Sequence, residues 1–178
     1  MSHSRHHARE VALQILYRHD VNTLQSAAQI AANAAAAEAA SGIMESTGTD
    51  GVSVEAPIQT ALPVKIIDVA EDLKSHFEHF QVAPGVRQFA AALVAGTLKD
   101  TPELDVQIEK FANNWKVPRM ATIDRNILRM SIFEMTKMKD IPATVTIDEA
   151  VELSKQFGTA ETAPFVNAIL DNIRKSLV

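Results

Sequence analysis

The chain has 178 residues, of which 47% are hydrophobic and 22% are charged, and its formal net charge is −5 at pH 7. This composition is typical of a globular protein, and the length fits a single domain. Because cysteine is absent, disulfides, cysteine-ligated metal centres and thiol nucleophiles are excluded. No apolar run approaches the roughly 20 residues that cross a bilayer, and the charged N-terminus differs from a signal peptide, so we expect a cytoplasmic location.

The first predicted element is an amphipathic helix over about residues 5–20. Arg5, His6 and Arg9 lie together on it at spacing i, i+1 and i+4, and His7 follows directly in the chain. These side chains form a basic turn that is suited to a surface that meets phosphate. The apolar positions recur at helical spacing on the inward face: Ala8, Val11, Ala12, Ile15 and Leu16.

The segment from about residue 24 to residue 63 has the composition of an insertion. Ten alanines fall within residues 27–40, a stretch of Gly, Ser, Thr and acids follows, and residues 21–63 contain no Lys or Arg. Alanine favours helix but provides almost no apolar face for packing. We therefore predict a marginal helix followed by a mobile loop, inserted in a single domain that covers residues 1–178.

Prolines divide the rest of the chain into intervals of helix length. Proline can begin a helix but is poorly tolerated inside one, so each proline is predicted near a helix start. Apolar residues follow helical spacing between them, and most aromatic residues fall on these faces and are predicted in the core. The prolines are Pro63, Pro84, Pro102, Pro118, Pro142 and Pro164, and the aromatic residues predicted in the core are Phe77, Phe89, Phe111 and Trp115.

The second half of the chain predicts the centre of the fold. Between residues 120 and 138 the apolar positions form two neighbouring stripes, so this helix should be contacted on two sides. Thr146 and Glu149 have capping-box spacing, and Gly158 is placed to end that helix in a left-handed conformation. A last helix is predicted at about residues 162–177. The result is an all-α fold, a compact bundle of about six or seven helices.

The sequence carries no recognisable catalytic motif. Its glycines do not form GxGxxG or GxxxxGK[ST], and GxSxG and HExxH are absent. His76 and His79 lack a second pair of ligands, so we interpret them as an exposed helix end. The acids at positions 148, 149 and 152 are interpreted as lying on the first turns of a capped helix, where acids favour its dipole. We therefore predict that the protein is not an enzyme and has no cofactor and no metal.

Two aromatic residues stand apart from the predicted core. Tyr17 follows the basic turn on its helix, and Phe165 lies at the edge of the apolar stripe of the last helix, directly after Pro164. Exposed aromatic rings beside basic residues can stack on the unpaired bases of single-stranded nucleic acid. From the pattern alone, surface stacking and ordinary packing both stay open.

Four segments of the sequence resemble the NusB family of bacterial transcription antitermination factors in order and spacing. They are AREVALQILY at residues 8–17, IDRNILRMSIFEM at 123–135, IPATVTIDEAVELSKQFG at 141–158 and FVNAILD at 165–171. The resemblance implies a compact NusB-like helical fold without catalytic activity. It also implies pairing with NusE, a protein of the small ribosomal subunit, and binding of the pair to single-stranded boxA RNA in ribosomal RNA leaders. That complex helps RNA polymerase in the elongation complex to pass terminators.

The resemblance also implies roles for individual residues. Arg5 and Arg9, with His6 and His7, fall in the family's basic RNA-binding stretch, and Tyr17 and Phe165 match its RNA-contacting aromatics. Glu161 matches an acidic position that weakens RNA binding, and Asp124 matches a position facing NusE. Histidines at positions 6 and 7 stand where the family often has arginines, and Ala163-Pro164 stands before Phe165 where basic or polar residues are common. We therefore expect weak RNA binding by this chain alone and dependence on NusE.

Two other interpretations stay open at this stage. One is the NusB-like domain that precedes a ribosomal RNA cytosine methyltransferase, which the length and the missing cysteine and glycine-rich loop disfavour. The other is a protein–protein adaptor with little or no direct RNA binding. The sequence does not decide between monomer and homodimer, because an apolar helical face looks the same whichever chain covers it.

Overall fold

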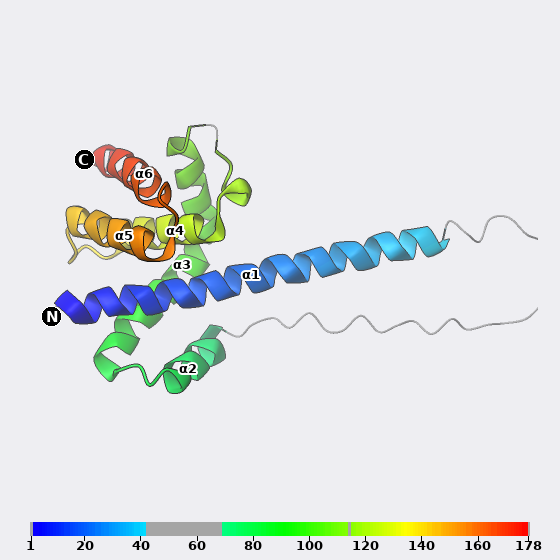
Figure 1. Cartoon of the computed structure of the whole chain (residues 1–178), viewed down its shortest axis with the longest axis horizontal. Helices are drawn as coiled ribbons and strands as arrows, with labels where there is room; N and C mark the ends of the chain where they lie inside the picture. Colours follow the sequence, from blue (N-terminus) through cyan, green and yellow to red (C-terminus); the bar gives the residue numbers. More distant parts are fainter. Residues whose placement is uncertain (1, 42–68, 114, 178) are drawn as a thin grey trace, which may run out of the picture.

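The structure is a computed structural model that describes residues 2–41, 69–113 and 115–177. Over these ranges the chain forms six α-helices and one short 3₁₀ helix, and no strand, which confirms the predicted all-helical class (Figure 1). None of the helices described is long and apolar enough to cross a membrane. The elements are α1 (Ser2–Ser41), α2 (Val69–His79), α3 (Pro84–Phe111), η1 (Val117–Arg119), α4 (Thr122–Lys137), α5 (Ala143–Phe157) and α6 (Thr162–Ser176).

Helix α4 is the centre of the bundle, as its two apolar stripes predict. It packs against α1, α3, α5 and α6, and Figure 1 shows it surrounded by them. Nine of its residues are buried, among them four polar ones, Arg125, Asn126, Ser131 and Glu134. The position of α4 therefore brings buried charges to the contacts with α1. Its fully buried apolar side chains are Ile127, Leu128, Met130 and Ile132.

The bundle contains α1 only in part. Its first half is docked through buried residues, including Ala8, Val11, Leu13 and Leu16. The side chains of residues 27–36 are all exposed, and α1 extends well past the bundle (Figure 1). The alanine-rich segment is thus the continuation of one 40-residue helix rather than a separate marginal helix. The loop predicted after it, residues 42–63, lies outside the described residues.

Helix α3 corrects the prediction that each proline lies near a helix start. Pro84 does occupy the first turn, but Pro102 lies inside the helix. A proline there removes one backbone hydrogen bond. Apolar residues are buried on both sides of Pro102, among them Val94 and Leu104, so packing holds the two parts in one helix. Glycine is required at Gly96, because a Cβ there would overlap the ring of Phe133 on α4.

The ends of α5 also differ from the prediction. The helix begins at Ala143 after Pro142, so Thr146 lies inside it and is not the N-cap. Its hydroxyl instead donates to Glu134 on α4 over 2.6 Å. Gly158 has φ −98°, which is not left-handed. Glycine is favoured at this position for a steric reason, because a Cβ would lie only 2.6 Å from the side chain of Thr162.

Because α5 begins before the predicted N-cap, its acidic residues lie further from the helix start than predicted. Asp148, Glu149 and Glu152 lie beyond the first turn of α5, and the dipole effect falls off within that turn, so the prediction that these acids favour the helix dipole is wrong.

Two predictions about individual rings are wrong. Trp115 was expected in the core but is 52% exposed. Helix α3 ends at Phe111, and Asn113 has a left-handed φ of 32°, so the helical spacing that predicts burial stops before Trp115. His76, expected at an exposed helix end, is buried, with no hydrogen-bond partner for either ring nitrogen among the described residues. Burial lowers the pKa of His76, and the charge of Arg18 lowers it further.

Candidate nucleic-acid interface

The basic turn at the start of α1 presents Arg5 to solvent. Its Nη2 donates to Asp140 over 3.1 Å, in a pair whose two side chains are about half exposed or more. The guanidinium also lies over the ring of Phe89, 5.4 Å from its centroid. Because an exposed pair of this kind is weak, Arg5 can exchange Asp140 for a phosphate at little cost.

The two histidines of this turn lie beside carboxylates. His6 Nδ1 is 2.7 Å from Glu149 on α5, and His7 Nδ1 is 2.9 Å from Glu10. His7 is exposed, whereas His6 is half-buried. Neither ring has the surroundings of a cation-rich phosphate site. Histidine in place of arginine therefore leaves the surface here less positive than the family resemblance implies.

Arg9 lies in the interior, where sequence reasoning did not place it. Its side chain is 4% exposed, and Nε and Nη2 donate to the two carboxylate oxygens of Glu134, both over 2.8 Å. Nη1 is 3.5 Å from Glu149. This bidentate pair joins α1 to α4, and the hydroxyl of Thr146 adds α5 to the same carboxylate. The guanidinium of Arg9 thus holds three helices together and is not presented to solvent.

Tyr17 lies at a surface pocket where three helices meet. Its side chain is 44% exposed. The apolar lining comes from α1, from the start of α4 and from the end of α5. A flat ring at the rim of an apolar hollow offers a face on which an unpaired base can stack. The other residues of the pocket are Leu13, Gln14, Ala121, Thr122, Ile123 and Phe157.

Phe165 is half-buried on the first turns of α6 and contacts an aromatic ring from a different segment. Its ring centroid is 6.0 Å from that of Trp115, with the two planes at 65°. Trp115 is the more exposed ring of the pair. Sequence reasoning missed Trp115 as a candidate surface residue. The sequence signal for a surface ring was the presence of basic residues nearby, Lys116 and Arg119. The same criterion singled out Tyr17.

Glu161 lies in the connection between α5 and α6, and Asp124, in the first turn of α4, is bonded to the residue that follows Glu161. Asp124 accepts a hydrogen bond from the Thr162 hydroxyl over 2.9 Å, and that hydroxyl oxygen accepts one from the backbone N–H of Thr159. Burial raises the pKa of Asp124, and the Thr162 hydrogen bond compensates only in part. Glu161 is exposed beside this contact. Asp124 therefore fixes the segment that leads to Phe165.

Replacing Asp124 by asparagine is expected to raise the urea midpoint of unfolding at pH 7. Asparagine keeps an acceptor for Thr162 but carries no charge to desolvate. Because the pKa of Asp124 is raised on folding, its protonated form stabilises the fold at low pH, and this contribution is lost as the pH rises through the folded pKa. The advantage of Asp124→Asn should therefore shrink at pH 3. Glu161→Gln, an exposed neighbour, is the control, and a lower midpoint for Asp124→Asn at pH 7 would contradict the expectation.

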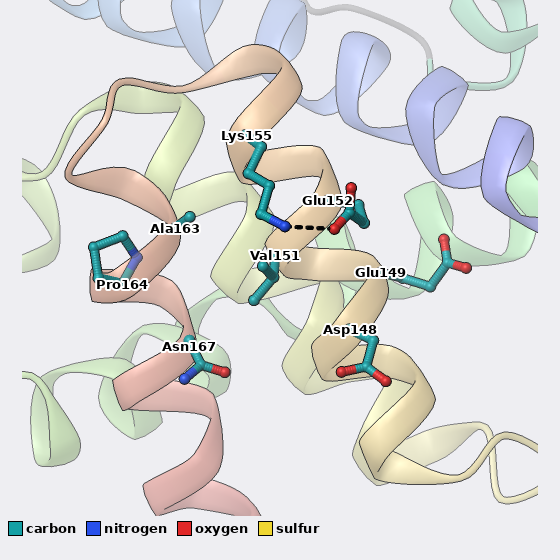
Figure 2. A pocket seen from close by; sticks show the side chains of 8 residues that line it. All are labelled: Asp148, Glu149, Val151, Glu152, Lys155, Ala163, Pro164 and Asn167. Carbon is teal, nitrogen blue, oxygen red and sulfur yellow. Dashed lines mark hydrogen bonds and ion pairs between the residues drawn. The ribbon is translucent and has the colours of Figure 1, made fainter.

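The groove between α5 and α6 is acidic (Figure 2). Three carboxylates and one lysine line it, and Lys155 is paired with Glu152 over 2.7 Å. Glu149 is also beside His6 and Arg9, and the lining holds more carboxylates than cations, which makes the groove less favourable for phosphate than the exposed Arg5. In the described residues, no group of three or more His, Asp or Glu side chains could hold a metal ion. The lining residues are Asp148, Glu149, Val151, Glu152, Lys155, Ala163, Pro164 and Asn167.

These features define a small helical protein with exposed aromatic rings at three places on the surface described, Tyr17, Phe80 and Trp115. Residues 57–175 match the model of the NusB family. A transcription antitermination protein NusB of Desulfitobacterium hafniense is 37% identical over 127 residues, which cover 69% of this chain and 86% of that protein. The NusB of Desulforapulum autotrophicum is 47% identical over 100 residues, which cover 56% and 69% of the two chains. The chain belongs to the NusB family.

Solved structures share the fold. A T. maritima NusB structure has a TM-score of 0.67 at 23% identity and covers 96% of this chain and 90% of that one. A crystal structure of antitermination factors NusB and NusE in complex with dsRNA has a TM-score of 0.68 at 20% identity, with 99% of both chains covered. The arrangement of helices seen here is therefore that of NusB structures.

Proposed function

We propose that this chain is a transcription antitermination factor that binds boxA-type single-stranded RNA together with NusE and acts, without catalysis, on the elongation complex in the cytoplasm. Membership of the NusB family carries this proposal. A structural relative, of which 99% is covered, is a complex of NusB and NusE with double-stranded RNA, and it supports the pairing with NusE and the contact with RNA. The preference for single strands is supported by the exposed rings described next.

The surface supports a preference for unpaired bases. Tyr17 is exposed beside an apolar hollow, and Phe165 has an exposed aromatic neighbour in Trp115. Rings in such positions bind bases by stacking, which a duplex does not allow because its bases are already stacked. Arg5 supplies the exposed positive charge at the start of α1.

The same surface predicts dependence on NusE. Arg9 is committed to Glu134, and His6 and His7 lie beside carboxylates. Few cations are left to neutralise phosphates, so the chain alone should bind RNA weakly and with a shallow salt dependence. These paired charges are also the observation that favours the second candidate function, a protein–protein adaptor with little or no RNA contact.

A titration of fluorescently labelled boxA-type RNA separates the two functions. The full chain is added with and without NusE of the same organism, at fixed near-physiological salt, with an unlabelled RNA duplex as competitor. Tight binding only with both proteins, resistant to the duplex, is expected. Undetectable RNA binding in both cases, with the two proteins still associating, would favour the adaptor. Tight binding with a steep salt slope in the absence of NusE would contradict the expected dependence on the partner.

Within that titration, Tyr17→Asp is expected to weaken RNA binding by about tenfold or more, because one base stack is worth about 1–3 kcal/mol. Tyr17 is 44% exposed and is not one of the buried core residues, so circular dichroism should show an unchanged fold. Tyr17→Phe keeps the ring and serves as the matched control. Unfolding of Tyr17→Asp, or RNA affinity equal to that of the parent, would show that Tyr17 packs and does not stack.

A further inference from the structure

Trp115 is an exposed apolar ring in a segment that otherwise buries its apolar residues. The connection between α3 and α4 places Val117 and Met120 in the core, at 2% and 5% exposure. Trp115 in the same connection is 52% exposed. A large aromatic surface left in water forgoes the favourable transfer that its neighbours gain. The connection therefore holds the indole at the surface.

The indole is held at a definite angle. Its edge-to-face contact with Phe165, at 6.0 Å between centroids, joins the α3–α4 connection to the start of α6. Phe165 is half-buried against the core. A contact of this kind fixes the orientation of the outer ring, which lowers the entropy that the ring loses when another flat group stacks on it.

The charges beside this pair of rings are arranged asymmetrically. Arg119, at the end of η1, is exposed, and its guanidinium forms no ion pair with any side chain in the described part of the chain. Lys116 is also exposed and is paired with Glu109 over 2.8 Å. Glu161 precedes α6, four residues before Phe165 in the chain. Of these charged residues in the described part of the chain, Arg119 is the cation without an ion pair.

We propose that Trp115 and Phe165 form a stacking platform for an unpaired base of single-stranded RNA, with Arg119 contacting the neighbouring phosphate. This inference rests on the proposed function and extends the RNA surface from Tyr17 to the α3–α4 connection. Exposed tryptophan is also common at protein interfaces. Arg119, four residues after Trp115 in the chain and without an ion pair among the described residues, and the defined ring orientation favour RNA, because stacking with a nearby cation is the way proteins hold single strands.

The test uses the fact that Trp115 is the single tryptophan of the chain. Indole fluorescence of the full chain, with NusE present and its own signal subtracted, is followed while unlabelled boxA-type RNA is added. Quenching that saturates at the same RNA concentration as the labelled-RNA titration is expected. Trp115→Ala should weaken RNA binding about 5- to 150-fold, and Trp115→Tyr should restore most of it. Arg119→Gln should lower the salt slope by about 0.7.

The matched control is Phe80→Ala. Phe80 is also an exposed ring, at 59% exposure. It lies just before the start of α3, whereas Trp115 follows the end of α3, and a helix of 28 residues is about 40 Å long. The Phe80→Ala variant should therefore bind RNA with the same affinity as the parent chain. Labelled RNA that binds normally without any change in indole fluorescence would overturn the platform and leave the proposed function standing. A fluorescence change caused by NusE alone, with none on RNA addition, would make Trp115 a protein contact. If the parent chain with NusE showed no RNA binding at all, both proposals would be overturned.

Discussion

Replacing Arg9 with methionine should lower the free energy of unfolding by about 3–5 kcal/mol, as expected when one partner of a buried ion pair is removed. Glu134 is 1% exposed, and both of its oxygens accept from Arg9. Without the guanidinium, the carboxylate keeps the Thr146 hydroxyl as its donor and stays in the core as an uncompensated charge. Urea unfolding followed by circular dichroism measures the effect.

Two variants make this result specific to the buried pair. Arg5→Ala breaks an exposed pair on the same turn and should cost less than about 1 kcal/mol. Arg9→Met combined with Glu134→Leu removes both charges and should recover much of the loss. If Arg9→Met kept the stability of the parent but lost RNA affinity, Arg9 would contact RNA, as the sequence alone suggests, and the buried pair would be refuted.

Removal of the Asp20 carboxylate is the second change expected to have a large effect. Asp20 Oδ2 accepts from Arg125 Nε over 2.6 Å, from Asn126 over 2.8 Å and from Arg129 Nη1 over 3.1 Å. All three donors lie on α4, so this carboxylate joins α1 to the central helix a second time. Arg129 would keep its pair with Asp105, but Arg125 would lose the carboxylate to which its Nε donates and would keep only neutral oxygens as acceptors. Asp20→Ala should therefore cost about 3 kcal/mol at pH 7.

The effect of Asp20 should depend on pH in a definite direction. Burial raises the pKa of Asp20, but hydrogen bonds from Arg125 and Asn126 and the charges of the two arginines outweigh burial, so the pKa lies below its ordinary value. A carboxyl with a lowered folded pKa stabilises the fold above its unfolded pKa of about 3.9, and this contribution is lost as the pH falls through the folded pKa. The urea midpoints of parent and Asp20→Ala should therefore converge toward pH 2.

The control for this pH series is Glu152→Ala, whose pair with Lys155 is more than half exposed on both sides. It should follow the parent at every pH to within about 1 kcal/mol. A gap between Asp20→Ala and the parent that stays constant from pH 7 to pH 2 would mean that the loss comes from packing and not from the charge of Asp20.

The fold was predictable where one pattern had one structural meaning. Two apolar stripes on residues 120–138 indicate a helix contacted on two sides, and α4 is that helix. Prediction failed where a pattern has two meanings. Thr146 and Glu149 have capping-box spacing, yet Thr146 bonds to Glu134, because a serine or threonine hydroxyl inside a helix can serve a neighbouring helix just as well. Helical spacing also extends past Phe111 to Trp115, although the helix itself has ended.

The candidate site was predictable in its residue types and less so in its geometry. Arginine at an i, i+4 position on an amphipathic helix has the same spacing whether it faces water or an acid on another helix. For Arg9, only the position of Glu134 decides between the exposed and the buried arrangement, and that position depends on the packing of α4. Aromatic rings present the same ambiguity. The exposure of Tyr17 and the contact of Trp115 with Phe165 depend on where helices end and cross, which single-sequence periodicity does not encode.

The docked half of α1 has a consequence for how its outer half becomes helical. Starting a helix in isolation is unfavourable, because several residues must be ordered before the first hydrogen bond forms, whereas adding a residue to an existing helix is nearly neutral or favourable for alanine. Residues 8–16 are fixed by the core and act as a permanent nucleus for the residues that follow. The alanine-rich segment thus needs no apolar face of its own, and excised as a peptide it would lose that nucleus and much of its helix content.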